Sequence, residues 1–228
     1  MTGKLKVSGF CWFFVIISFN PVLSQHFNVV MPADRDLNNA ILYLSEFIAS
    51  PYFDSLNRSL ESAALVDTLY KRALDFYNQD HSEALLALLF VTLPYNKIPA
   101  TIPILNSAIE IPLPSVNDSL FYLKRRNLPK KIFFDSPATE MGDKDKLPHF
   151  FGSAFLSYEV SIFNLSKFMG ILIELFEETF KVEGYIDYRD LLADDLGTVF
   201  GDMLKNNNEL MPSQVLIIYN LFFIRNIN

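Results

Sequence analysis

Cysteine is almost absent from this chain, with one residue among 228. A single cysteine cannot form a disulfide within the chain, so a disulfide-stabilised scaffold is excluded. Basic residues are also outnumbered, 19 Lys and Arg against 26 Asp and Glu. The resulting net charge of −7 argues against a nucleic-acid binder, which needs a basic face. Beyond the N-terminal segment no uncharged run is long enough for a confident membrane span, and no internal repeat is found.

Hydrophobic residues are plentiful, by contrast, and make up 50% of the sequence, with 22 Phe among them. A chain of this composition must bury apolar surface to stay in solution, which excludes intrinsic disorder. Its length suits one domain or two small ones and is sufficient for a substantial core.

Residues 1–24 have the pattern of a secretory signal peptide. Two lysines precede the uncharged stretch Val7–Phe19, and Val22 and Ser24 stand three and one positions before a cleavage ahead of Gln25. An uncleaved N-terminal anchor is the alternative, although a membrane span needs about 20 apolar residues. We expect an exported, periplasmic or envelope-associated protein. Cleavage removes the cysteine, which excludes thiolate metal sites and cysteine nucleophiles.

Hydrophobic periodicity predicts a mainly α fold, in which residues 25–140 form a helical and Pro-rich extended region. Helices are expected over about 37–48, 55–78 and 82–93, and the last is apolar on all sides and therefore buried. From Pro94 to Pro114, closely spaced prolines exclude interior helix because each lacks an amide donor. Edge strands or extended loops are expected there.

A basic cluster without intervening acids follows this extended segment. Its members are Lys124, Arg125, Arg126, Lys130 and Lys131. Three interpretations remain open: a solvated face, a partner for the acidic C-terminal part, or a contact with anionic lipid or envelope polymers.

Residues 141–228 form the second predicted region, which contains a three-helix unit. The capping signals place its helices at about 148–164, 166–181 and 187–204. The apolar run at 215–224 is expected to be a core strand or a short helix.

Polar residues and glycines recur at helical spacing along this unit. They are His149 and Ser153 on the first helix, Glu174 and Glu177 on the second, and Asp190, Asp194, Gly197 and Gly201 on the third. A glycine within a helix costs about 1 kcal/mol relative to alanine, which is tolerated where a neighbouring helix approaches closely. We therefore expect close packing at the glycines and a polar cluster that joins the three helices.

The same spacing resembles a known bacterial family. The matching motifs are Asp145-Lys146, His149-Phe150, Gly152-Ser153, Leu156-Ser157, Gly170-x3-Glu174-x2-Glu177 and Asp190-x3-Asp194-x2-Gly197-x3-Gly201. They resemble the YfiM-type periplasmic proteins, whose function is unknown, and more weakly the VanZ-like membrane proteins. The chain departs from the VanZ-like pattern with Glu177 where Gln is usual and Asp194 where Asn is usual. The resemblance implies a place at the bacterial cell envelope and assigns no reaction.

Two functional interpretations of the polar cluster remain. In the favoured one, the carboxylates and His149 satisfy one another and lock the helices together, without any cofactor, in an envelope protein with a structural or interaction role. In the alternative, a metal-dependent or His/carboxylate hydrolase acts on an envelope substrate. One histidine among carboxylates suits Mg²⁺, Ca²⁺ or Mn²⁺ better than Zn²⁺, and His149 near Ser153 suits a general base.

The expected partners are an envelope protein or a peripheral membrane contact, and no nucleic acid. A soluble or peripherally attached protein is favoured because acids in the middle of a membrane span are costly. A membrane hairpin over Leu147–Phe176 is the alternative, since Glu159, Lys167 and Glu174 are the only charged side chains of this range besides His149. The sequence does not indicate an oligomeric state.

Overall fold

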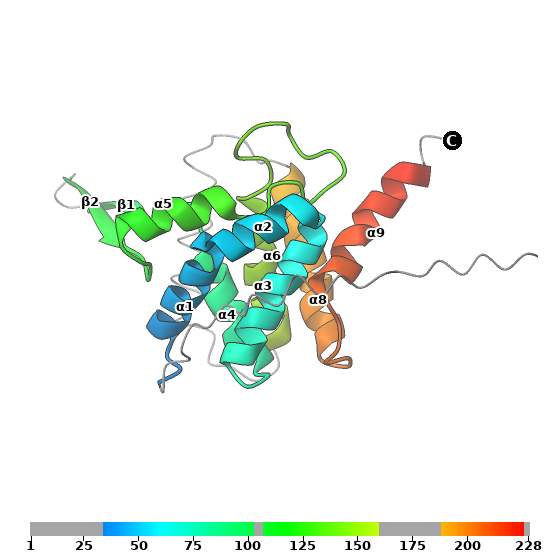
Figure 1. Ribbon diagram of the computed structural model, residues 1–228, viewed down its shortest axis with the longest axis horizontal. Helices are drawn as coiled ribbons and strands as arrows, with labels where there is room; N and C mark the ends of the chain where they lie inside the picture. Colours follow the sequence, from blue (N-terminus) through cyan, green and yellow to red (C-terminus); the bar gives the residue numbers. More distant parts are fainter. Residues whose placement is uncertain (1–33, 103–106, 160–187, 226–228) are drawn as a thin grey trace, which may run out of the picture.

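The computed structural model describes residues 34–102, 107–159 and 188–225 (Figure 1). Within these ranges the chain forms eight helices and one two-stranded sheet, so the predicted mainly α fold is confirmed. The elements are α1 (Leu37–Ala49), α2 (Pro51–Ser59), α3 (Ser62–Phe76), α4 (His81–Thr92), β1 (Lys97–Ile102), β2 (Ser107–Pro112), α5 (Asp118–Asn127), α6 (Lys146–Glu159), α8 (Tyr188–Leu204) and α9 (Pro212–Arg225). The signal-peptide pattern and the helix expected near 166–181 lie outside the described residues.

Ser50 ends the first helix and begins the second. Its hydroxyl accepts a hydrogen bond from the Phe53 amide at 3.1 Å, which caps α2. Pro51 occupies the first position of α2, where a missing amide donor costs nothing. Pro51 therefore starts the next helix directly after the cap that ends α1.

The single helix expected over 55–78 is wrong, because the chain forms two helices there. Leu60 and Glu61 both adopt extended backbone angles and separate α2 from α3. The break allows α2 to contact α1 and α5, whereas α3 packs against α4 and α9. Apolar periodicity continues across the break, so the pattern alone did not reveal it.

Helix α4 lies in the middle of the bundle, as predicted from its apolar residues, which lie on all sides of the helix. Asp80 caps it by accepting a hydrogen bond from the Glu83 amide at 3.2 Å. Nine of its twelve residues are buried, and it contacts α1, α3 and α6. A helix with no polar face needs neighbours on all sides, and this position provides them.

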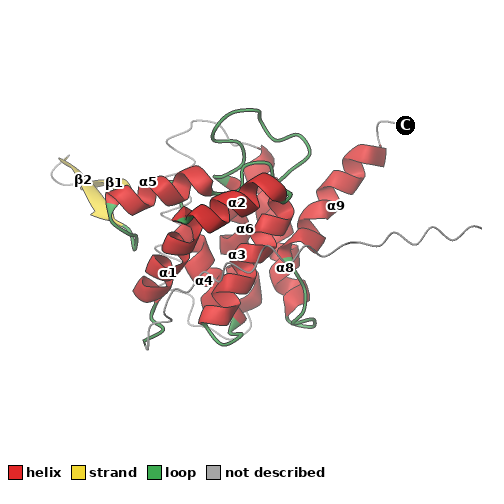
Figure 2. Ribbon diagram, viewed as in Figure 1, coloured by secondary structure: helices red, strands yellow, loops and turns green. Residues whose placement is uncertain are grey.

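The proline-rich segment forms an antiparallel hairpin of β1 and β2, paired from Lys97↔Pro112 to Ile102↔Ser107. Of the two alternatives expected for this segment, edge strands and extended loops, the structure shows strands over Lys97–Ile102 and Ser107–Pro112. The hairpin lies beside the start of α5, away from the helical bundle (Figure 2). Helix α5, which is capped by Asn117, was not predicted. It carries the first three residues of the basic cluster in its last turn, and the other two lie in the loop that follows.

One large hydrophobic cluster joins residues from both sides of position 141. Leu44, Leu88, Phe150 and Phe200 all belong to it. The apolar run at 215–224 lies in a helix, α9, which packs against α3 and α8. In the part of the chain that the structure describes, no helix is long and apolar enough to cross a bilayer.

Candidate functional site

Helices α6 and α8 lie side by side and run in the same direction, and two glycines set how closely they approach. A Cβ atom on Gly197 would lie 2.2 Å from the carbonyl oxygen of Phe150, and one on Gly201 would lie 2.2 Å from that of Ala154. Gly197 and Gly201 are one turn apart on α8, and Phe150 and Ala154 are one turn apart on α6, so the same contact repeats along the interface. The backbone of α6 occupies the space that larger residues on α8 would need.

A polar ladder continues this interface toward the N-terminal ends of the two helices. Lys146 Nζ forms an ion pair with Asp190 Oδ1 at 2.6 Å. His149 lies between two acids, with Nε2 3.5 Å from Asp190 Oδ1 and Nδ1 3.3 Å from Asp194 Oδ1. Ser153 donates a hydrogen bond to Asp194 Oδ1 at 2.8 Å. The ladder therefore alternates between α6 and α8.

Burial differs along the ladder. The side chains of His149 and Asp190 are 3% and 5% exposed, whereas that of Asp194 is 28% exposed. Charges taken out of water at such positions need close partners, because solvation is lost there. Lys146, which donates to Asp145 Oδ2 at 2.8 Å as well, supplies the positive charge at the buried end.

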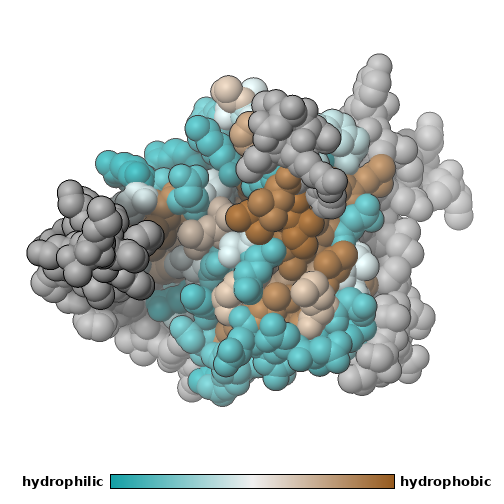
Figure 3. Space-filling view, turned by 90° about the vertical axis from the view of Figure 1, so that its right-hand side faces the viewer, coloured by the Kyte–Doolittle hydropathy of each residue, from teal (hydrophilic) through white to brown (hydrophobic). Residues whose placement is uncertain are grey.

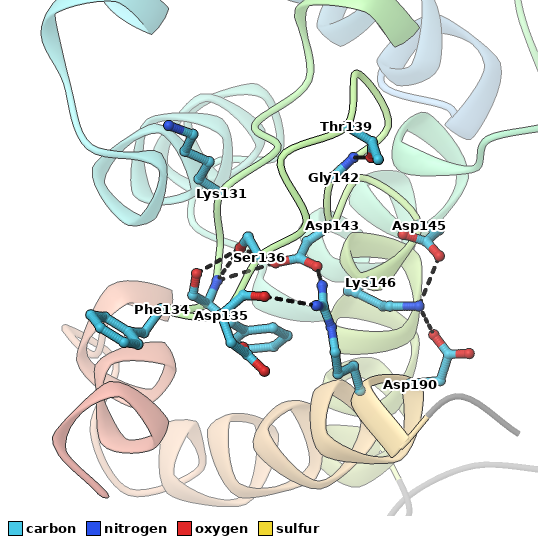
Figure 4. Close-up of polar contacts among 12 residues, drawn as sticks. Lys131, Phe134, Asp135, Ser136, Thr139, Gly142, Asp143, Asp145, Lys146 and Asp190 are labelled. Atoms are coloured by element: carbon cyan, nitrogen blue, oxygen red, sulfur yellow. Dashed lines mark hydrogen bonds and ion pairs between the residues drawn. The ribbon is translucent and has the colours of Figure 1, made fainter. Parts of the chain in front are cut away.

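A second buried ion pair lies one residue before the ladder. Arg189 pairs with Asp143, whose carboxylate also accepts hydrogen bonds from Ser136 and, at 3.3 Å, from the Phe133 amide (Figure 4). Arg189 donates to the backbone carbonyl of Asp135 at 3.1 Å. This pair attaches the loop that precedes α6 to the first turn of α8.

The predicted site residues can now be placed. His149, Ser153, Asp190 and Asp194 lie together between α6 and α8, whereas Glu174 and Glu177 fall outside the described residues. Gly197 and Gly201 lie one and two turns further along α8. The stripe of four residues on α8 thus meets one face of α6.

Sequence reasoning missed three charged members of this cluster: Asp143, Lys146 as a partner of Asp190, and Arg189. A signal was available in the charge order. Asp143 and Lys146 are negative then positive, and Arg189 and Asp190 are positive then negative, so the two segments are complementary. Their wide separation along the chain hid this complementarity.

The geometry does not match a nucleophilic triad. In a triad the histidine stands between the serine and the acid and takes the proton from the hydroxyl. Here Ser153 donates directly to Asp194, and both ring nitrogens of His149 face carboxylates. Over residues 34–102, 107–159 and 188–225, no group of three or more His, Cys, Asp or Glu is arranged to hold a metal ion.

His81 comes just after the turn at residues 77–79, and it is buried rather than exposed to solvent. It is the first residue of α4, 7% exposed, and its Nδ1 lies 2.7 Å from the hydroxyl of Tyr70. Burial lowers the pKa of His81 and raises that of Tyr70. The neutral pair is an internal contact between α3 and α4.

The basic cluster contains one residue that is not part of a solvated face. Lys124 is 1% exposed, and its Nζ donates to the backbone carbonyl of Val91 and lies 4.9 Å from the ring centre of Phe121. Burial lowers the pKa of Lys124 to about 7. Among the described residues, Arg125, Arg126, Lys130 and Lys131 have no ion pair with an acid of the C-terminal part.

Comparisons of this chain with models of protein families, with curated proteins and with solved structures return no match. The resemblance to the YfiM-type proteins thus stays a prediction that rests on the spaced motif.

Proposed function

We propose that this chain is a non-catalytic protein of the bacterial cell envelope with a structural or interaction role. The observation that carries the proposal is the position of His149. Both of its ring nitrogens face carboxylates of the neighbouring helix, and its side chain is 3% exposed. An imidazole in this position joins α6 to α8 and presents neither nitrogen to a substrate.

An apolar surface supports the interaction role. The side of the molecule that carries α9, on the right of Figure 1, has a hydrophobic patch in its middle (Figure 3). The exposed large apolar side chains of α8 and α9 include Leu191, Val199, Met203, Ile217, Ile218 and Leu221. Apolar patches on a protein surface often mark contacts with a partner. An envelope protein that covers this surface fits the proposed role.

Export to the envelope is the second part of the proposal. It is supported by the signal-peptide pattern of residues 1–24 and by the YfiM-type motif, whose Lys146, His149, Asp190 and Asp194 belong to the ladder. The proposed location is the periplasm or a membrane surface, where the partner is an envelope protein or the membrane periphery.

A metal-dependent or His/carboxylate hydrolase is the alternative. One observation favours it: Asp194 is 28% exposed and accepts the hydrogen bond of Ser153, so the ladder has one end that solvent can reach. Divalent cations that prefer oxygen ligands are the ions to test there.

Calorimetric titration of the folded chain with Mg²⁺, Ca²⁺, Mn²⁺ and Zn²⁺ distinguishes the two. A structural ladder predicts no binding heat and no rise in the melting temperature, because its carboxylates already have partners. Heat that appears with the native chain and disappears in His149→Ala and in Asp194→Asn would contradict the proposal. Asp195→Asn, which changes an exposed acid on the same helix, is the matched control.

A further inference from the structure

A hollow of about 320 Å³ lies between α5 and the turn that precedes α6. Its lining residues are Tyr122, Arg125, Arg126, Glu140, Met141 and Lys144. The volume is at the lower end of the range for small-molecule sites. The ladder between α6 and α8 contributes no residue to it.

The turn that forms one wall of the hollow is held in place by its backbone. Gly142 has a φ of +56°, and a Cβ atom there would lie 2.1 Å from the carbonyl oxygen of Lys130. The next amide, of Asp143, donates to that same carbonyl at 3.0 Å, and the Gly142 amide donates to Thr139 Oγ1 at 3.0 Å. Only glycine combines this backbone conformation with so close an approach. The wall is therefore built into the fold.

Lys144 is fixed at the hollow by a buried contact. It is 4% exposed, and its Nζ donates to the backbone carbonyl of Arg126 at 2.9 Å. Burial, followed by the positive charge of Lys130, lowers the pKa of Lys144. Arg125 lowers it further, and Glu140 opposes this change. Cations crowd one another here, and an anion would relieve the repulsion.

The two arginines have no ion-pair partner in the part of the chain that the structure describes. Their place in the last turn of α5 is explained in part by the helix dipole, which favours cations at a C-terminus. The dipole does not explain the position of Lys144, which lines the same hollow but belongs to the turn that precedes α6. In a chain with a net charge of −7, this gathering of cations is a local exception.

We propose that this hollow binds the phosphate group of an organic phosphate. Arg125 and Arg126 bind the phosphate oxygens through their planar guanidinium groups, and Lys144 adds a third positive charge. With Glu140 as the acid of the lining, its net charge is plus two, which matches a phosphate monoester at neutral pH. Tyr122, which is 65% exposed, and Met141 contact the organic part of the ligand.

The phosphate can belong to a soluble molecule or to a lipid headgroup, and two arms of one experiment separate these sources. In the first arm, the full chain is titrated calorimetrically with inorganic phosphate and with phenyl phosphate. In the second, it is floated with phosphatidylcholine vesicles that contain or lack phosphatidic acid. Binding to phenyl phosphate alone indicates a soluble ligand, and flotation only with phosphatidic acid indicates a lipid. Either result supports the proposal.

Variants locate the binding. Arg125→Gln and Arg126→Gln are each expected to weaken phenyl phosphate binding about tenfold or more, because each removes a charge-assisted hydrogen bond. Neither side chain has a partner among the described residues, so the melting temperature should not change. Tyr122→Ala should abolish the preference for phenyl phosphate over inorganic phosphate. Lys131→Gln removes an exposed charge of the same basic cluster outside the hollow, and its binding should stay within about twofold of the native value.

Two results would overturn the proposal. One is the absence of binding to phenyl phosphate and to phosphatidic acid vesicles alike. The other is an equal loss of binding in Lys131→Gln and Arg125→Gln, because only the general charge of the surface would then matter.

Discussion

At the scale of single residues, Lys124 shows how a polar side chain is accommodated inside the helical core. The chain buries its ammonium group with a single backbone acceptor, the carbonyl of Val91, and the face of the Phe121 ring. No carboxylate is involved in these two contacts. Because a charge without a counter-ion is costly in such surroundings, burial lowers the pKa of Lys124 to about 7.

Lys124→Met is expected to stabilise the protein at pH 7. Methionine fills a similar volume without a charge, and the gain exceeds the loss of one hydrogen bond to Val91, so the free energy of unfolding should rise by about 1–3 kcal/mol. Urea unfolding measures it. Lys131→Met, at an exposed position, is the control and should change stability by less than about 0.5 kcal/mol.

The effect of Lys124→Met should also depend on pH. The pKa of Lys124 is lower in the folded state than in the unfolded chain, so the unfolded state binds more protons between the two values. The native protein therefore gains stability as the pH rises above 7, by roughly 1.4 kcal/mol per pH unit from this group. The advantage of Lys124→Met should shrink from pH 7 to pH 9; an advantage that is constant over this range would show that Lys124 is not titrating there.

At the scale of elements, the pairing of α6 with α8 depends on two residues that are poor helix formers. Gly197 and Gly201 weaken α8 as an isolated helix, yet they allow the backbones of the two helices to meet at Phe150 and Ala154. Helix propensity and packing make opposite predictions about the same substitution, and this makes the interface easy to test.

Gly197→Ala and Gly201→Ala are each expected to lower the free energy of unfolding by about 1–3 kcal/mol. The overlap of the new Cβ with a backbone carbonyl outweighs the gain of about 1 kcal/mol in helix propensity. Thr198→Ala lies between them on the exposed side of α8 and should be neutral or slightly stabilising. Melting curves decide the point, and a rise in stability for either glycine variant would mean that the helices are further apart.

The ion pair between Asp143 and Arg189 is expected to show strong coupling in a double-mutant cycle. Each of Asp143→Ala and Arg189→Met leaves a buried partner without its counter-charge and should cost about 3–5 kcal/mol, whereas the double variant should cost less than their sum. The exposed pair of Asp202 and Lys205, 3.0 Å apart, is the control and should couple by less than about 0.5 kcal/mol. Additive effects at Asp143 and Arg189 would contradict a direct pairing of the loop with α8.

At the scale of the whole molecule, most helices could be predicted because apolar periodicity and proline reflect local chemistry. Helices α1, α4, α6 and α8 and the extended proline-rich segment follow from that pattern. The break at Leu60 and the burial of His81 could not be predicted in this way, since both depend on neighbours that are distant in the sequence. Helix α5 was missed although its cap, Asn117, is a local signal. The local sequence pattern therefore predicts where helices form better than it predicts what each helix packs against.

The same limit applies to the candidate site. Spacing on single helices singled out His149, Asp190 and Asp194, which the structure brings together. Their cationic partner Lys146, and the ion pair of Asp143 with Arg189, required knowledge of which helices meet. The spacing of residues along one helix identifies the face that carries them. It does not identify which segment packs against that face.

We propose that the ladder between α6 and α8 holds the fold together and performs no reaction. The most direct test is the free energy of unfolding of His149→Ala, measured by urea titration beside Asp195→Ala as an exposed control. A structural ladder predicts a loss of about 2–4 kcal/mol for His149→Ala, because Asp190 and Asp194 lose a buried neighbour, and almost none for the control. Residues of catalytic sites are often kept at the expense of stability. An unchanged or increased stability of His149→Ala would therefore contradict the structural role and favour a functional one.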